Sequence, residues 1–240
     1  AEPELRLAGL RLNPANSGPS RNSTYTGMTL RTLTGGNERP VSGLPEGARI
    51  DDVRWSPDGE RFAFTITHAD RIDLWVGEVS TAEARRVTDA ALNNVYFGTP
   101  FEWLPDSRTL LARTVPPYRG PVPEEDPVPA GPVIQENTGA EAPARTYQDL
   151  LEDAYDEAVF EHFMTSQPRL VDVNGGDRPF LEPALFTRTS VSPDGGHVIV
   201  ESIHRPFSYL VPASRFPTRI EVYDLEGNLV HEVADLPLQE

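Results

Sequence analysis

Short apolar segments alternate with tight polar turns along most of the chain. Three turns have the sequence Ser-Pro-Asp-Gly or a close variant, at residues 56–59, 104–107 and 192–195. Each follows an apolar strand end and precedes an apolar run of strand length, which predicts a buried strand. Proline presets φ, aspartate hydrogen-bonds its own backbone, and glycine supplies a positive φ, so each turn predicts a hairpin.

The spacing of these turns indicates a repeated unit. Asp58 and Asp106 lie 48 residues apart, close to the ~40–50 residues of a four-stranded propeller blade. Asp106 and Asp194 lie 88 residues apart, which corresponds to one blade and about 40 additional residues. The predicted fold class is therefore all-β, with the blades arranged as in a β-propeller.

We predict one incomplete β-propeller domain over residues 1–240. It contains about three four-stranded blades, which begin near residues 50, 98 and 187, and partial strands before residue 45. A closed propeller needs at least four blades, so the others are expected outside this sequence. Three tryptophans recur at blade positions and are expected to pack between blades: Trp55, Trp75 and Trp103.

The additional residues predict a helical insertion over residues 116–163. Between residues 116 and 143 prolines are dense and strand patterns are absent, which is typical of an extended loop. Thr146 and Asp149 have the spacing of a helix N-terminus. Apolar residues then recur at helical spacing as far as Phe163. This apolar face is expected to dock on the propeller or on a further domain, and the alternative is a gate at a cavity between them.

The composition excludes several classes of function. The chain carries 37 acidic and 21 basic residues, a net charge of −16, so nucleic acid is not an expected partner. Without cysteine there are no disulfides, thiol nucleophiles or cysteine-bound metals. The five histidines lack metal-ligand spacing, so we predict no metal and no cofactor. No apolar run reaches the length of a membrane span.

We also predict no catalytic residue in this chain. The serine nucleophile of an α/β-hydrolase requires the elbow sequence Gly-x-Ser-x-Gly, which holds the serine on a strained turn between strand and helix. The nearest match surrounds Ser20, where Pro19 stands beside the serine and Asn22 replaces the last glycine. Ser20 is therefore not expected to be a nucleophile.

Several longer motifs, in order along the chain, are more specific than the turns. They are Leu-Ala-Gly-Leu-Arg-Leu-Asn-Pro at residues 7–14, Arg-Thr-Tyr-Gln-Asp-Leu-Leu-Glu-Asp at 145–153 and His-Arg-Pro-Phe-Ser-Tyr-Leu-Val-Pro at 204–212. Together with Gly-Pro-Ser-Arg at 18–21 and Ser-Arg-Phe-Pro at 214–217, they resemble the glutamyl endopeptidase group of the prolyl oligopeptidase family. The matching blocks extend over nearly the whole chain.

The resemblance implies a two-domain serine peptidase. Such proteins have an N-terminal β-propeller that caps a C-terminal α/β-hydrolase domain with a Ser-Asp-His triad, and members of this group cleave peptide bonds after glutamate. The propeller restricts access, so smaller peptides are the usual substrates. The hydrolase domain is absent from this chain. We therefore expect a substrate-gating part that is inactive alone, with the hydrolase domain and peptide substrates as its partners.

Selection for glutamate requires a group that binds a side-chain carboxylate. Arginine suits this role because its planar fork donates two charge-assisted hydrogen bonds. Within the family-like motifs the first candidate is Arg205 and the second is Arg215. The alternative is that both make structural salt bridges or contact the hydrolase domain. His204 is expected to order the loop that contains Arg205 through a hydrogen bond.

Two other functions stay open at the level of sequence. One is a free-standing propeller that acts as a protein-interaction scaffold, and the other is the propeller of an aminopeptidase or dipeptidyl-peptidase relative. Within the resembled group, bacterial members are often exported and plant members are plastid proteins. An exported, periplasmic bacterial protein is the favoured expectation, and a cytoplasmic protein is the alternative. The first residues do not form a signal peptide.

Overall fold

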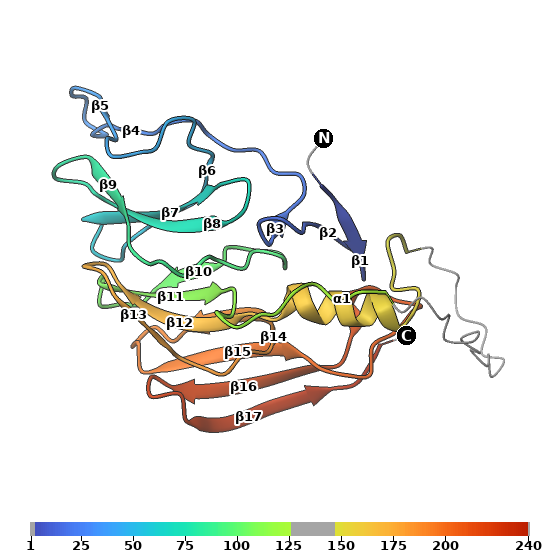
Figure 1. Cartoon of the computed structure of the whole chain (residues 1–240). Coiled ribbons are helices and arrows are strands. Elements are labelled where there is room, and N and C mark those ends of the chain that lie inside the picture. The colour runs from blue at the N-terminus through green and yellow to red at the C-terminus, as the bar shows by residue number, and fades with distance from the viewer. Residues whose placement is uncertain (1–2, 126–146, 240) are drawn as a thin grey trace.

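Antiparallel strands in five sheets, with one α-helix, make up the computed structural model, which describes residues 3–125 and 147–239 (Figure 1). Three sheets have four strands, and their strands are β6 (Ile50–Trp55), β7 (Arg61–Thr67), β8 (Ile72–Glu78), β9 (Glu83–Arg86), then β10 (Phe101–Trp103), β11 (Thr109–Thr114), β12 (Gln167–Asp172), β13 (Asp177–Pro179), then β14 (Leu185–Val191), β15 (His197–Ile203), β16 (Thr218–Asp224) and β17 (Leu229–Leu236). In each sheet the strands are neighbours in chain order. The sheets follow one another in space as successive layers (Figure 1).

The three four-stranded sheets have the meander of propeller blades. They begin at Ile50, Phe101 and Leu185, near the predicted residues 50, 98 and 187. We call them the first, second and third sheets. The all-β propeller architecture with one short helix is therefore confirmed.

The N-terminal residues depart from the prediction of partial strands. They form a three-stranded sheet, β1 (Leu5–Leu7), β2 (Leu10–Asn13) and β3 (Gly18–Pro19), and a small hairpin, β4 (Thr29–Leu30) and β5 (Arg39–Pro40). Ala8 and Gly9 both have positive φ, 51° and 81°, which turns β1 into β2 within two residues. These strands are too short for an alternating pattern. Counted as blades, the sheets of three or four strands therefore number four, not about three.

The predicted turns have the expected conformation. Gly59 and Gly195 both have a φ of 72°, and Ser107, in the equivalent position of the second turn, has a φ of 57°. The Ser56 hydroxyl lies 2.6 Å from Asp58 Oδ1 and accepts the Arg61 N–H at 2.9 Å. The third turn repeats this bonding around its own serine. Local chemistry thus closes each hairpin.

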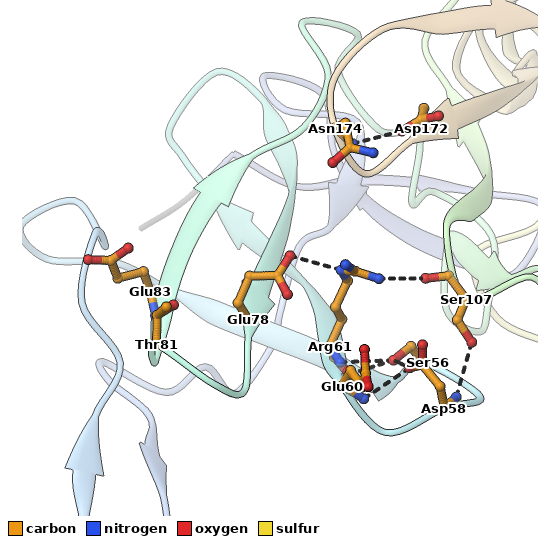
Figure 2. A network of polar contacts seen from close by, with 10 residues as sticks. All are labelled: Ser56, Asp58, Glu60, Arg61, Glu78, Thr81, Glu83, Ser107, Asp172 and Asn174. Carbon is orange, nitrogen blue, oxygen red and sulfur yellow. Dashed lines mark hydrogen bonds and ion pairs between the residues drawn. The ribbon is translucent and has the colours of Figure 1, made fainter.

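Side-chain bonds also tie the first turn to the second (Figure 2). The Asp58 N–H donates to Ser107 Oγ at 3.0 Å, and Arg61 Nη1 donates to the Ser107 carbonyl at 3.3 Å. Arg61 Nε also donates to Glu78 Oε1 at 2.8 Å, across the first sheet. Ser107 is buried, so these bonds are partly shielded from water. The first two sheets are joined at this end by Ser107.

The apolar cores lie between successive sheets. Leu110 packs in the cluster shared with the first sheet, beside Leu74, whereas Leu111 packs in the cluster shared with the third sheet, beside Val198. Adjacent strand residues point to opposite faces, so one strand contributes to two cores. Trp103 lies between sheets, and its Nε1 donates to the Arg54 carbonyl at 3.1 Å.

The other two tryptophans differ from the expectation of packing between blades. Trp55 is 56% exposed, so the prediction is wrong for this residue. Trp75 is half-buried and packs against the core of the first sheet and the β4–β5 hairpin, the cluster that includes Phe64 and Val41. The position of a tryptophan in the repeat therefore does not decide its burial.

The helix α1 (Ala154–Met164) is shorter than the helical part of the predicted insertion. Its N-cap is Asp153, whose side chain accepts the Asp156 N–H, and the predicted start at Thr146 lies outside the described residues. Residues 147–153 are not helical, since Asp149 has a φ of 60° and the Gly9 N–H donates to its carbonyl at 2.7 Å. This bond ties the segment to the β1–β3 sheet instead.

The apolar face of α1 docks on the rest of the fold, as predicted. Phe160 and Phe163 are fully buried in a cluster that includes Leu10 of the N-terminal sheet and Phe207 and Phe216 of the segment between β15 and β16. That segment contains one turn of 3-10 helix, η1 (Ala213–Arg215). No helix among residues 3–125 and 147–239 is long and apolar enough to cross a membrane.

Candidate functional site

Both predicted arginines lie in the segment between β15 and β16, which we call the 204–217 loop. Phe207 and Phe216 hold this loop against α1, because their ring centroids lie 5.2 and 5.7 Å from that of Phe160. The two loop rings also stack on each other at 5.3 Å. Aromatic pairs at these distances add to the stability that burial provides. The loop is thus a fixed platform for its charged side chains.

Arg205 is occupied by two carboxylates of α1. Its Nε donates to Glu161 Oε1 at 2.8 Å, and its Nη1 forms a short ion pair with Glu157. The guanidinium also lies 4.7 Å from the ring centroid of Phe207. Bonds to Glu161 and Glu157 raise the pKa of Arg205. These are the structural salt bridges that the alternative reading of Arg205 describes.

Tyr209 completes this cluster. Its hydroxyl donates to the second oxygen of Glu157 at 2.7 Å. Burial and this bond raise the pKa of Tyr209 to about 12. One helix carboxylate therefore joins two residues of the loop.

Arg215 has a different environment. Its Nη1 donates to the Gln239 carbonyl at 3.4 Å, and its guanidinium lies 5.9 Å from the ring centroid of Tyr147. Among the described residues no carboxylate lies within 4.0 Å of its guanidinium. Within the described part of the chain, Arg205 thus makes two ion pairs and Arg215 makes none.

His204 orders the start of the loop, as predicted. Its Nδ1 lies 2.8 Å from the Arg205 carbonyl and its Nε2 lies 2.8 Å from Asp235 Oδ1 in β17. Asp235 also accepts a hydrogen bond from Arg219 Nη2 at 3.2 Å. Bonds to His204 and Arg219 lower the pKa of Asp235. The loop is therefore anchored to α1 on one side and to the third sheet on the other.

Ser20 is buried, and its hydroxyl is bonded to a carboxylate. It is 7% exposed, and its hydroxyl donates to Glu4 Oε2 at 2.8 Å. Glu4 in turn pairs with Arg6 at 2.9 Å, so the serine hydroxyl belongs to a polar network beside the N-terminal sheet.

Two sequence relatives match the whole chain. No model of a known protein family matches the chain. A rice protein (Oryza sativa subsp. japonica) named "Probable glutamyl endopeptidase, chloroplastic" is 39% identical over 254 residues, covering all of this chain and 27% of the relative. An Arabidopsis thaliana protein of the same name is 36% identical over 253 residues, covering all of this chain and 26% of the relative. Over its whole length the chain is thus similar to one part of proteins named as glutamyl endopeptidases.

The chain corresponds to only part of each of these relatives. It spans about a quarter of the length of the curated relatives it matches. Both relatives are chloroplastic by name. They give no support to the periplasmic compartment that was the favoured expectation.

Solved structures resemble the chain more distantly. Pyrococcus horikoshii acylaminoacyl peptidase matches with a TM-score of 0.46 and 17% identity, covering 88% of this chain and 28% of that one. The β-propeller domain of the trilobed protease from Pyrococcus furiosus matches with a TM-score of 0.45 and 15% identity, covering 87% and 48%. The sequence relatives therefore carry more weight than the solved structures.

Proposed function

We propose that this chain is the substrate-gating propeller part of a serine peptidase that hydrolyses peptide bonds after glutamate. The observation that carries the proposal is the 39% identity, over the whole chain, to a relative named as a glutamyl endopeptidase. In this proposal an α/β-hydrolase domain outside the chain supplies the Ser-Asp-His triad. The chain itself supplies shape and charge that select which peptides reach the triad.

Arg215 and Arg205 are the proposed contacts for the substrate carboxylate. Arg215 is the stronger candidate, because among the described residues no carboxylate neutralises it. Arg205 would have to release Glu157 or Glu161 before it could bind a substrate. A guanidinium binds a carboxylate through two parallel hydrogen bonds, which distinguishes glutamate from its neutral amide analogue.

The proposal is tested on the full-length protein with peptides that differ only in the residue before the cleaved bond. Glutamate, glutamine and aspartate are compared, each in a peptide with a free and with an acetylated amino terminus. Cleavage that needs glutamate, ignores acetylation and stops with a serine-directed inhibitor is the expected result. Equal cleavage of the glutamine peptide would exclude selection by charge.

The same assay separates the alternatives. Cleavage that requires a free amino terminus would identify an aminopeptidase or dipeptidyl-peptidase relative. A protein that cleaves none of the peptides, yet binds other proteins, would identify a scaffold. In the proposal, the 240-residue chain alone cleaves nothing, because its nucleophile lies elsewhere.

A further inference from the structure

A cavity of about 700 Å³ lies where the first strands of the three four-stranded sheets meet. Its lining includes Arg54 and Trp55 from β6, Glu102 from β10, and Arg188 from β14. A cavity of this size is within the range of ~300–1,000 Å³ that is usual for ligand sites. None of the residues discussed in the 204–217 loop lines it.

Two of the first strands are bulged next to this cavity. In β6 the pairing shifts between Asp51 and Arg54, so two residues oppose one of β7. In β14 the pairing shifts between Phe186 and Arg188. A bulge redirects the side chains that follow it, and bulges are frequent beside functional sites. Each bulge thus ends at an arginine that lines the cavity.

The bulge in β6 also holds a strained residue. Asp52 has a φ of 53°, in the left-handed region that aspartate enters more readily than most residues. Its carboxylate accepts a hydrogen bond from Thr99 Oγ1 at 3.1 Å and one from Asn94 Nδ2 at 3.4 Å. Burial raises the pKa of Asp52. The surrounding structure therefore specifies this conformation, although it has a local energetic cost.

A third arginine is built into the cavity wall. Arg113 is only 4% exposed, and its Nη1 donates to the carbonyl of Thr187, the extra residue of the β14 bulge, at 2.9 Å. Its Nη2 donates to the Thr99 carbonyl at 3.4 Å. Burial lowers the pKa of Arg113 to about 10, so it is still charged near neutral pH. Among the described residues its side-chain hydrogen bonds go to backbone carbonyls, and the charge of Asp52 favours its charged form.

The other two arginines are exposed to the cavity. Arg54 Nη2 donates to Thr99 Oγ1 at 2.6 Å, and among the described residues it makes no ion pair. Arg188 Nη1 lies 3.4 Å from Glu201 Oε1, a long contact for an ion pair. The remaining acid of the lining is Glu102, which accepts the Val191 N–H at 3.1 Å and whose pKa burial raises.

Charge and shape together indicate the ligand class. In a chain with a net charge of −16, three arginines surround this cavity. The exposed rings of Trp55 and Phe97, 56% and 68% exposed, stand in the lining and offer flat apolar contact. Guanidinium groups beside exposed aromatic rings suit a chain that carries both carboxylates and apolar atoms.

We propose that this cavity binds a peptide segment with carboxylate side chains, held by Arg54 and Arg188. This site extends the proposed function, and the choice of an acidic peptide as its ligand rests on that proposal. It would hold acidic peptides within the propeller. Arg113 supports this binding in two ways. It holds the bulged strand β14 through its bond to the Thr187 carbonyl, and it adds positive charge to the cavity wall.

Binding is measured on the full-length protein, with turnover blocked by a serine-directed inhibitor. The probe is a short fluorescent peptide with adjacent glutamates, and its counterpart has glutamine at the same positions. We compare the unsubstituted protein with Arg54→Gln, Arg188→Gln and the double variant. Arg85→Gln is the control, because Arg85 is also exposed but lies on the outer strand β9.

Arg54 and Arg188 should each increase the affinity for the glutamate peptide about tenfold, which is usual for a hydrogen bond to a charged group. The double variant should bind it up to about a hundredfold more weakly, and the Arg85→Gln control should bind as the unsubstituted protein does. The glutamine peptide should bind weakly throughout. Unchanged affinity in the double variant, or equal affinity for both peptides, would overturn the site.

The cleavage assay and the binding assay therefore test the proposed function and the proposed site separately. A protein that does not cleave after glutamate, yet binds the glutamate peptide through Arg54 and Arg188, retains this site and loses the proposed function. A protein that cleaves after glutamate, with binding indifferent to both arginines, retains the function and loses the site. Circular dichroism and thermal unfolding of each variant exclude misfolding, which is not expected because both side chains are exposed.

Discussion

Replacing Ser107 separates two energetic effects of opposite sign. Its hydroxyl accepts a hydrogen bond from the first turn at 3.0 Å, and its backbone has a φ of 57°. Alanine removes the bond but keeps a Cβ in the left-handed region. A hydrogen bond of this kind contributes about 0.5–1.5 kcal/mol net. Ser107→Ala should therefore lower the free energy of unfolding by about 1 kcal/mol.

Glycine removes the same hydrogen bond and also relieves the backbone. A left-handed conformation costs an L-residue roughly 1–2 kcal/mol, and the extra freedom of glycine in the unfolded chain returns about 0.4–1 kcal/mol of that. Ser107→Gly should therefore be more stable than Ser107→Ala by about 0.5–1 kcal/mol. The order of the two variants is the sensitive part of the prediction.

Equilibrium unfolding of the full-length variants in urea, followed by tryptophan fluorescence, measures the difference. Trp103 lies in the same sheet as Ser107 and contacts the first sheet, so it reports on this junction. Ser80→Ala, at an exposed serine in the turn between β8 and β9, is the control. The reasoning is refuted if alanine at position 107 is neutral, or if glycine there is less stable than alanine.

The remaining predictions concern charge. Arg215→Ala should lower kcat/KM for a glutamyl peptide about tenfold or more and leave the glutamine counterpart unchanged; Arg85→Ala is the control, and equal losses on both peptides would exclude a carboxylate contact. Arg205→Ala should lower the thermal unfolding midpoint slightly, since half-exposed ion pairs contribute no more than about 1 kcal/mol, and it should change KM less than Arg215→Ala does; the reverse order would make Arg205 the substrate contact. Burial raises the pKa of Glu102, so the folded state disfavours its charged form at pH values above that pKa. Glu102→Gln should therefore raise the unfolding midpoint at neutral pH, and the gain should shrink as acid protonates the glutamate of the parent; an equal gain at both pH values would contradict this.

The parts of the fold that follow from local chemistry could be predicted from the sequence. The turns at Gly59 and Gly195 need only a proline, an aspartate and a residue that tolerates positive φ, and all three are adjacent in the sequence. The first strand of each four-stranded sheet follows from the spacing of these turns. By contrast, residues 147–153 before α1 are tied to the N-terminal sheet, because the Asp149 carbonyl accepts the N–H of Gly9, 140 residues earlier. No local pattern contains such a contact.

The candidate site also has parts that the sequence predicts and parts that only the structure shows. The sequence identifies Arg205 and Arg215 as residues of family-like motifs, but not that Glu157 and Glu161 neutralise only the first of them. Those acids are 48 and 44 residues away, on a helix whose docking sets their position. The cavity arginines were missed altogether. The adjacent acids Asp51 and Asp52, which interrupt the alternation of an apolar strand, are the one sequence signal for the bulge beside them.

Neighbouring residues of β11 pack into two different cores, and this constrains how the sequence can vary among relatives. A change of volume at Leu110 must be absorbed in the first sheet, for example at Leu74, whereas a change at Leu111 must be absorbed in the third sheet, for example at Val198. Adjacent positions should therefore co-vary with different and distant partners and hardly with each other. A single-residue deletion within β11 would exchange the two sets of partners at once.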